Sequence, residues 1–333
     1  MLKKLLYFVG VALLLVIFAV GCGGSGEPAA EEETMVEEAA EPAEEAASED
    51  AAAPKDEEAA TDEEMADEEE MADVAFDNSL LDTFDATNFE NSATIDNNWL
   101  PLVPGTHWVY EGTTTEDGEA IAHRIEFTMT DLVKEVAGVQ TAVAFIEDYA
   151  EDELVEAEIA FYAQDKEGTV WYLGEYPEEY ENGEFVKAPA WITGIDGAKA
   201  GIKMWAKPEM GMPDYPQGWG PAVEWTDRGQ IDQMGQDVCV PVECYSDVII
   251  VREFTWDAPT AFQLKYHAPG VGDVKVSWEG DDQTQEELEL TEFTHLDADS
   301  MAEFREKALM LEEHAYERSK DVYGQTEPAV PAS

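Results

Sequence analysis

Basic residues are scarce in this sequence of 333 residues. Lys and Arg number 18 against 76 Asp and Glu, which gives a formal net charge of −58 at pH 7. Nucleic acids and anionic membrane surfaces also carry negative charge, so a protein that binds them needs a basic face. The composition therefore excludes nucleic acid as a partner, and it excludes adsorption to an anionic membrane through side chains.

Cysteine and histidine are also rare, with three and five residues. Three cysteines are too few for a small disulfide scaffold, and a chain of this length can bury a core without one. No two histidines have the spacing of a zinc motif, and there is neither a Gly-x-Ser-x-Gly elbow nor a phosphate-binding glycine loop. The sequence thus identifies no catalytic residue, no metal site and no cofactor.

Residues 1–22 have the parts of a bacterial targeting segment. Lys3 and Lys4 form a positive start, and an apolar run follows from Leu5 to Val20. Ala19-Val20-Gly21-Cys22 resembles the lipobox of bacterial lipoproteins, although Ala19 stands where that family usually has Leu. The alternative is an uncleaved signal anchor, but the apolar run is shorter than the roughly 20 residues that span a bilayer.

Acylation of Cys22 would make the lipid bilayer a partner of this chain. Each buried CH₂ of an acyl chain contributes about 0.8 kcal/mol to membrane binding, so several chains would hold the protein firmly. Both the lipoprotein and the signal-anchor interpretations place the rest of the chain outside the cytoplasm. We therefore expect an exported protein, anchored in either the cell membrane or the outer membrane.

Residues 23–75 read as a linker. They contain 22 acidic residues and a single Lys55, and the remainder is mainly Ala. Such a segment cannot bury enough apolar surface to offset the entropy of ordering, so the composition predicts a disordered acidic tether.

Residues 76–296 have the pattern of antiparallel β structure. All nine Trp lie in or beyond this region, and apolar and polar residues alternate strictly in several segments. Val155, Ala157, Ile159 and Phe161, for example, alternate with Glu156 and Glu158, which predicts a strand with one face in water. Turn signals separate the strands at residues 116–118, 137–138, 165–168, 181–183 and 269–270.

This spacing predicts a mainly β fold. Nine or ten strands without intervening helices favour an antiparallel meander that closes into a barrel or a strongly curled sheet. A β-sandwich is the alternative.

A long segment at 188–227 interrupts the strand pattern. It is rich in aromatic residues, Gly and Pro, so it is either a lid packed over the sheet or a binding region. Large aromatic side chains in irregular segments usually anchor them to the core. If the segment binds a ligand, the candidate residues are Trp191, Met204, Trp205, Tyr215, Trp219 and Trp225.

The C-terminal region predicts a docked helix over residues 297–324. Ser300 and Glu303 form a capping box, and apolar residues then recur at helical spacing until Gly324. Residues 325–333 read as a loose tail.

Cys239 and Cys244 are the two cysteines left after Cys22. A tight turn around Pro241 could bring them to the roughly 5.5 Å Cα separation of a disulfide. Because an exported protein meets an oxidising environment, we expect this pair to form a structural disulfide.

Three motifs resemble a family of secreted bacterial lipoproteins of unknown function. The opening motif runs from Asn98 to Tyr110 and reads NWLPLVPGTHWVY; Tyr162 to Tyr172 resembles the central hairpin of that family, and Tyr266 to Gly272 its late turn. The resemblance implies an exported, β-rich domain with no established activity, and it carries over no catalytic residue. Each motif also has a structural explanation in its Pro, Gly and aromatic residues.

These observations lead to three functional hypotheses. The first is a membrane-anchored, non-enzymatic β domain that binds an apolar or glycan ligand through the aromatic segment. The second is a structural or assembly role in the cell envelope, with envelope proteins as partners. The third, a hydrolase of envelope material, has the least support because no nucleophile, base and orienting residue can be named together.

Overall fold

The computed structural model describes residues 76–332. The predicted targeting segment at 1–22 with Cys22, the predicted tether at 23–75 and residue 333 lie outside the described residues. Within 76–332, no helix combines the length and the apolar character needed to cross a membrane.

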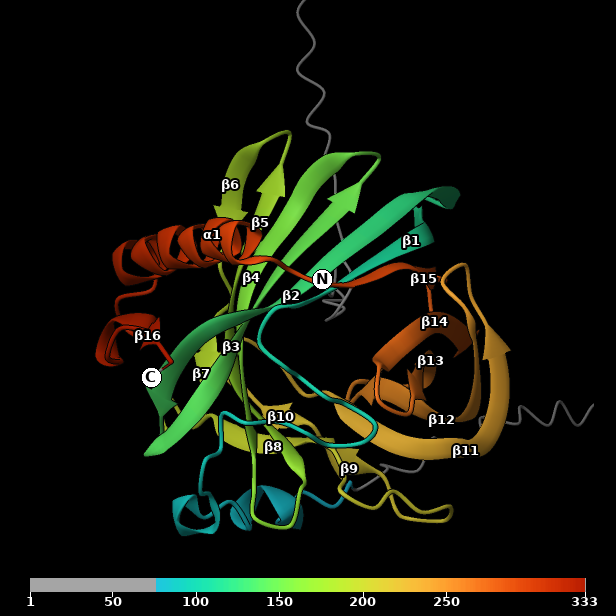
Figure 1. Ribbon diagram of the computed structural model, residues 1–333, viewed down its shortest axis with the longest axis horizontal. Helices are drawn as coiled ribbons and strands as arrows, with labels where there is room; N and C mark the ends of the chain where they lie inside the picture. Colours follow the sequence, from blue (N-terminus) through green and yellow to red (C-terminus); the bar gives the residue numbers. More distant parts are fainter. Residues whose placement is uncertain (1–75, 333) are drawn as a thin grey trace, which may run out of the picture. The chain divides into compact units, whose positions relative to one another are not determined.

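Most of the described chain is antiparallel β structure (Figure 1). Two runs of long strands are separated by a set of short ones. The first run is β1 Thr106–Glu116, β2 Glu119–Val136, β3 Val139–Ala150, β4 Glu153–Gln164 and β5 Val170–Glu181. The short strands are β6 Glu184–Lys187, β7 Trp191–Ile192, β8 Lys199–Met204, β9 Tyr215–Pro216 and β10 Gly218–Trp219. The second run is β11 Arg228–Cys239, β12 Cys244–Thr255, β13 Ala258–Ala268, β14 Gly272–Gly280 and β15 Glu287–His295.

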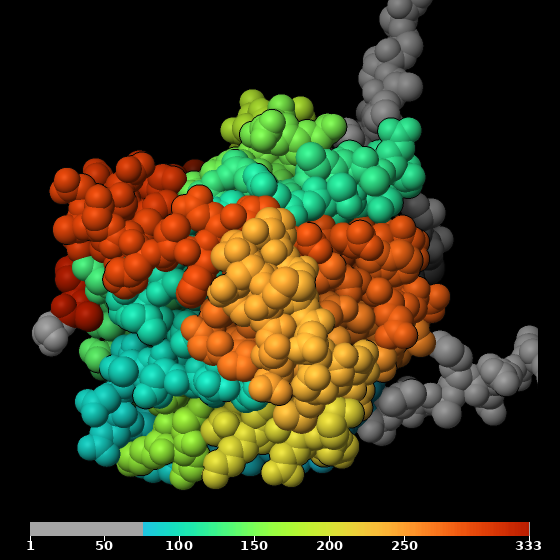
Figure 2. Space-filling view, turned by 45° about the vertical axis from the view of Figure 1, so that its right-hand side comes forward, coloured from blue at the N-terminus to red at the C-terminus, as the bar shows by residue number. Residues whose placement is uncertain are grey.

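These strands form one sheet in the order β10-β8-β5-β4-β3-β2-β1-β15-β14-β13-β12-β11-β9. The two runs meet where β1 pairs with β15, and the space-filling view shows the orange C-terminal strands directly beside the teal N-terminal ones (Figure 2). Both ends of the sheet come from the predicted aromatic segment: β10 pairs with β8, and β9 pairs with β11.

The prediction of a sheet that closes into a barrel or curls strongly is wrong. The sheet is open, and in the described residues no ladder joins β9 to β10. The physical reason lies in the 188–227 segment, which makes strands of only two residues at β7, β9 and β10 instead of the long strands needed to close the ring. Alternation in the long strands indicates their pairing but carries no information about how the ends meet.

The predicted hairpin turns are confirmed. Asp117 and Gly118 join β1 to β2, and both have positive φ, at 51° and 82°. Asn182 and Gly183 do the same between β5 and β6, at 52° and 75°. Two-residue turns of this kind match the right-handed twist of the strands, which is why Asp-Gly and Asn-Gly pairs predict hairpins reliably.

The C-terminal helix α1 spans Ala298–Arg318, so it ends earlier than the predicted boundary at residue 324. Its N-cap is Asp297, whose carboxylate accepts a hydrogen bond from the backbone N–H of Ser300 at 2.9 Å. The predicted capping box, with Ser300 as the N-cap, is therefore wrong: the N-cap lies three residues earlier, at Asp297. Ser319 is the C-cap of the helix, and a 3₁₀ helix at Tyr323–Gln325 follows. Two further 3₁₀ helices lie near the start of the described chain, at Ser79–Asp82 and Ala86–Asn88.

The last described residues are not a loose tail. Strand β16, Val330–Pro331, pairs with Val133 and Leu132 of β2. This pairing occupies the stretch where the β2–β3 ladder shifts register between Met129 and Val133.

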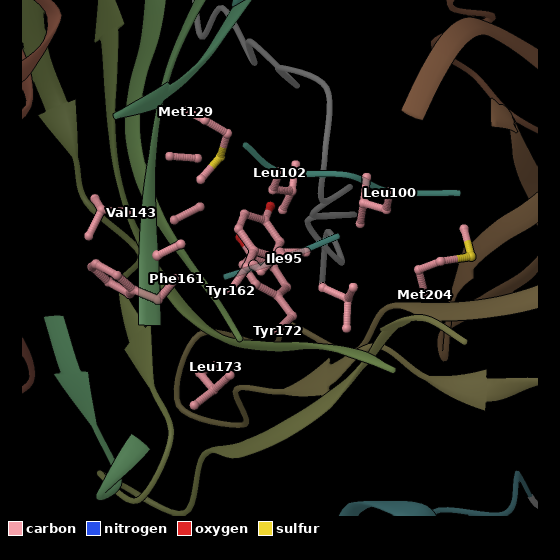
Figure 3. Close-up of a cluster of buried hydrophobic side chains, with 14 of the residues drawn as sticks. Ile95, Leu100, Leu102, Met129, Val143, Phe161, Tyr162, Tyr172, Leu173 and Met204 are labelled. Atoms are coloured by element: carbon pink, nitrogen blue, oxygen red, sulfur yellow. The ribbon is translucent and has the colours of Figure 1, made fainter. Parts of the chain in front are cut away.

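Strands β2 to β5 have two differently covered faces. Helix α1 covers one, which we call the helix face; the other, the inner face, is turned toward β8, β12 and β13 (Figure 1). The N-terminal segment also packs into the core: Figure 3 shows Ile95, Leu100 and Leu102 in the same buried cluster as Tyr162 and Tyr172.

Candidate functional site

The structure buries four of the six residues predicted to bind a ligand. Trp191, Met204, Tyr215 and Trp225 have almost no exposed surface, whereas Trp205 and Trp219 are half-buried. The rings of Trp191 and Trp225 pack with centroids 4.7 Å apart, and both contact the ring of Tyr172 on β5. This trio anchors the aromatic segment to the inner face.

The other predicted residues lie in separate groups. Trp205 packs edge-on against Tyr215, with ring centroids 5.6 Å apart. Trp219 instead packs against Trp256 in the turn between β12 and β13, at 5.6 Å. The structure thus brings Trp191 together with Trp225, and Trp205 together with Tyr215. Trp219 lies apart from both pairs, beside Trp256.

Several polar atoms of this segment are buried without a hydrogen-bond partner among the described residues. Among them are Trp205 Nε1, Tyr215 Oη, Gln217 Oε1, Trp225 Nε1 and Asp227 Oδ1. A buried polar group without a partner costs about 1–3 kcal/mol, so several such groups in one segment call for an explanation. These atoms include both donors and acceptors, and a polar molecule with hydroxyl groups could satisfy both kinds.

Charged side chains extend this polar surface across the inner face. We define the inner polar cluster as the carboxyl groups and bases that interact there, from β2 to β15. Its carboxyl groups are Asp148, Glu156, Glu158, Glu175, Asp227, Glu253, Asp273 and Glu286, and its bases are His123, Lys203, Lys265 and His267.

Glu253 on β12 lies at the centre of this cluster. One of its carboxylate oxygens accepts hydrogen bonds from Lys203 Nζ at 2.8 Å and from Gln217 Nε2 at 2.5 Å. Burial acts to raise the pKa of Glu253, but Lys203, Lys265 and the Gln217 hydrogen bond together hold that pKa at about 2. Glu253 is therefore ionised and fixes the positions of its three neighbours.

His123 on β2 is held between two carboxylates. Its Nε2 lies 2.7 Å from Asp148, and its Nδ1 lies 3.0 Å from Glu286. Burial acts to lower the pKa of His123, but the two carboxylates outweigh it and raise the pKa to about 10. The imidazole is thus a permanent cation at neutral pH, and it joins β2, β3 and the start of β15. Among the described residues, no group of three or more His, Cys, Asp or Glu side chains has the geometry to hold a metal ion.

Glu158 and Glu175 share one tyrosine. Tyr172 Oη lies 3.1 Å from a Glu158 oxygen and also contacts a Glu175 oxygen. A hydroxyl has one hydrogen to donate, so it can satisfy only one ionised carboxylate; the other carboxyl must bring its own proton. Burial, together with the neighbouring carboxylates, raises the pKa of Glu158 to about 7 and that of Glu175 further above its ordinary value.

The prediction that Glu156 and Glu158 lie on a face in open water is wrong. Both are half-buried on the inner face, where β4 lies beside Tyr172 and Glu175 of β5. Alternation shows that a strand has two chemically different faces, but it does not show what covers the polar one. Lys203, Glu253, Asp227 and the other cluster residues were also missed, because a sequence with 76 acidic residues gives no means of selecting the few that are buried.

Cys239 and Cys244 form a disulfide across the β11–β12 turn, with Cα atoms 3.9 Å apart. The pair lies at the end of the hairpin, and neither cysteine belongs to the inner polar cluster.

The three sequence motifs lie together as structural elements. The indole N–H of Trp108, in the opening motif, donates to the carbonyl of Val271 in the late turn at 3.0 Å. Asn97, next to the opening motif, donates from Nδ2 to the Gly168 carbonyl in the central hairpin at 2.8 Å. Within that hairpin, Asp165 accepts a hydrogen bond from the Trp171 indole at 2.9 Å. The motifs thus join distant parts of the sheet.

No protein-family model and no curated protein matches this chain. Two solved structures are similar to part of it. One is a protein of Bacteroides fragilis, proposed to be exported and described as having a YmcC-like fold, with a TM-score of 0.36 and 10% identity. The other is a protein of Parabacteroides distasonis, proposed to be a lipoprotein, with a TM-score of 0.35 and 11% identity. Each match covers 60% of this chain and 99% of the other. TM-scores below 0.5 establish no shared fold, so nothing about the site follows from either likeness.

Proposed function

We propose that the protein is an exported lipoprotein held to a membrane by acylated Cys22. The support is the order of a positive start, an apolar run and a lipobox-like Ala19-Val20-Gly21-Cys22. Metabolic labelling with an alkyne fatty acid tests this proposal. We expect the label at Cys22 in the wild type and none in Cys22→Ser, and unlabelled wild-type protein in the cytosol would contradict it.

We further propose that the β domain binds a polyhydroxylated ligand, such as a glycan, between the aromatic segment and the inner face. The observation that carries this proposal is the set of unpartnered polar atoms on Tyr215, Gln217, Trp225 and Asp227. Sugar hydroxyls both donate and accept hydrogen bonds, and indole and phenol rings pack against the apolar faces of sugars. The apolar ligand in our sequence hypothesis fits less well, because it would leave these atoms unpaired.

Some residues of the inner polar cluster are partly exposed to solvent. Lys203 keeps 21% of its side chain exposed, and Glu156 and Glu158 are half-buried. Lys203 and the buried Gln217 donate to the same Glu253 oxygen, so a partly exposed polar side chain and the proposed binding residue belong to one hydrogen-bonded group.

The test is calorimetric titration with a panel of monosaccharides and short oligosaccharides. Tyr215→Phe removes one unpartnered hydroxyl without changing the ring, so we expect it to weaken binding about tenfold. Tyr316→Phe is the matched control: Tyr316 lies on the helix face, and its hydroxyl is already occupied by Lys134 and Thr326. Its affinity should equal that of the wild type.

The proposal is one of binding without catalysis, so the saccharide should be recovered unchanged after incubation. Hydrolysis of any panel member would instead favour the hydrolase hypothesis, with the Glu158–Glu175 pair as its candidate residues. If no saccharide binds, the ligand proposal fails, and the envelope-assembly role becomes the hypothesis to pursue by cross-linking.

A further inference from the structure

Acidic groups outnumber bases in the inner polar cluster. Eight carboxyl groups face two lysines and two histidines, and burial favours the neutral form of one of these histidines, His267, by lowering its pKa. Uncompensated charge is costly in a region largely removed from water. The surplus carboxyl groups must therefore be neutralised by protons or by a bound cation.

Two acceptor oxygens near the centre of the cluster have no donor in the described part of the chain. They are Asp227 Oδ1 and Gln217 Oε1, on residues with 6% and 1% of their surface exposed. The two residues are neighbours, because the backbone N–H of Gln217 donates to the Asp227 carbonyl at 2.8 Å. The two side chains thus start from adjacent positions of the backbone.

The orientation of the Gln217 amide follows from its partner. Its Nε2 lies 2.5 Å from an oxygen of the ionised Glu253, which requires a donor and not a second oxygen. Gln217 Oε1 is therefore the atom left without a partner, and the amide cannot be flipped to remove it. Lys203 Nζ donates to the same Glu253 oxygen at 2.8 Å, and neither Gln217 Oε1 nor Asp227 Oδ1 receives a hydrogen bond from it.

We propose that the ligand carries a protonated amino group, which donates hydrogen bonds to the Asp227 carboxylate and to the Gln217 amide oxygen. This inference rests on the proposed function and narrows its ligand class to amine-bearing saccharides, such as hexosamines. An ammonium group supplies up to three donors and one positive charge, so it satisfies both oxygens and reduces the acidic surplus at once. The indole N–H of Trp225 and the hydroxyl of Tyr215 remain for the sugar oxygens.

Binding of such a group should displace a proton. Burial and the nearby Glu253 carboxylate raise the pKa of Asp227 to about 8, against the opposing effect of Lys203 and Lys265. Asp227 is then largely protonated at pH 6 in the free protein, and it must ionise to pair with an ammonium group. The other titratable groups that face it are Glu175 and Asp257.

The experiment compares three sugars that differ only at C2: glucosamine, N-acetylglucosamine and glucose. Each is titrated calorimetrically into the wild-type protein at pH 6, in two buffers of different ionisation enthalpy. We expect glucosamine to bind at least about tenfold more tightly than either neutral sugar. We also expect its binding to release close to one proton, a measurement that requires no variant.

Asp227→Asn tests the assignment of the site, because asparagine has the shape of the protonated acid but cannot ionise. This variant should lose both the preference for glucosamine and the proton release. Asp281→Asn is the matched control: it makes the same Asp-to-Asn change at an exposed turn residue and should change neither. An equal loss in both variants would show long-range attraction to an acidic protein and would overturn the inference.

The outcomes separate this inference from the function on which it rests. Equal binding of glucose and glucosamine, or glucosamine binding without proton release, overturns the amine inference and leaves saccharide binding intact. If neither these three sugars nor any other saccharide of the panel binds, both the amine inference and the proposed saccharide binding are overturned.

Discussion

The two faces of the sheet formed by β2 to β5 bury charge in different ways. On the helix face, Lys134 Nζ donates to Glu312 of α1 at 2.9 Å, to Tyr316 at 3.2 Å and to the Glu327 carbonyl at 2.5 Å. The carboxylate of Glu312 also accepts from Tyr323 Oη at 2.8 Å. Every donor of the buried lysine is thus used.

Glu178 of β5 gives a second example on the helix face. Its side chain is fully buried, yet it accepts hydrogen bonds from Tyr176 at 2.5 Å, from Tyr180 at 2.6 Å and from Arg318 of α1 at 2.6 Å. Saturated networks of this kind position one element against another, and they leave no capacity for a ligand.

The inner face has comparable burial but incomplete pairing. Asp227 and Gln217 retain free acceptors, and Glu158 and Glu175 compete for a single hydroxyl. Burial of charge alone therefore does not mark a functional site in this protein. The useful signal is the imbalance between donors and acceptors, and four measurements test this difference between the two faces.

Lys134→Met should have the largest effect. It leaves the Glu312 carboxylate buried without its cation, and breaking a buried pair in this way costs about 3–5 kcal/mol. Urea denaturation measures the loss of unfolding free energy. The double variant Lys134→Met with Glu312→Gln removes the orphaned charge and should recover part of it; a single variant as stable as the wild type would show that the helix face is not held by this network.

Asp227→Asn should change the pH dependence of stability. A carboxyl group with an ordinary pKa near 4 in the unfolded chain and about 8 in the folded protein holds a proton that the unfolded chain has released. The contribution of Asp227 to the free energy of unfolding therefore falls as pH rises from 4 to 8. Between pH 5 and 9 the wild type should lose about 4 kcal/mol more than the variant. Parallel curves from thermal unfolding would contradict a protonated Asp227.

Tyr215→Phe should stabilise the ligand-free protein. The hydroxyl of Tyr215 is buried without a partner, and removing an unsatisfied polar group recovers its desolvation cost, about 1 kcal/mol. Denaturant midpoints of wild type and variant provide the measurement. Tyr323→Phe on the helix face is the contrast, because that hydroxyl donates to Glu312 and its loss should destabilise. Equal effects of the two variants would remove the distinction between the faces.

Lys199→Met should have the smallest effect. Its ion pair with Asp82, at 2.6 Å, joins side chains that are 46% and 73% exposed, so solvent screens the attraction. Surface pairs of this kind contribute at most about 0.5 kcal/mol in most cases. A larger change in the unfolding free energy would mean that exposed ion pairs also hold the short strands in place. The stabilisation could then not be assigned to the buried networks alone.

Local features were predictable from the sequence wherever the signal itself was local. Asp117-Gly118 and Asn182-Gly183 predict hairpins because few residue pairs adopt positive φ at low cost. The helix was predictable from the spacing of Ala308, Leu311 and Ala315, which are all buried. Its start was misplaced because Asp297 and Ser300 are both good N-caps, and only the structure shows which side chain accepts the hydrogen bond.

The candidate site was predictable only in its aromatic half. Tryptophans in an irregular segment can be identified from the sequence alone. The rings of Trp191 and Trp225 are in contact on the inner face. Its polar half depends on long-range contacts: Lys203 reaches Glu253 across 50 residues, and Gln217 reaches it across 36. No spacing rule connects such positions, and barrel closure was misjudged for the same reason.

The segment Tyr215–Trp219 contributes strands to both ends of the sheet within five residues. Because β9 and β10 lie so close together in the chain, separation of β9 from β11 should also disturb the pairing of β10 with β8. Backbone amides in these two ladders should therefore exchange with deuterium as one cooperative unit. A molecule resting against Tyr215 and Gln217 would slow both together, so occupancy of the site could be followed at either end of the sheet.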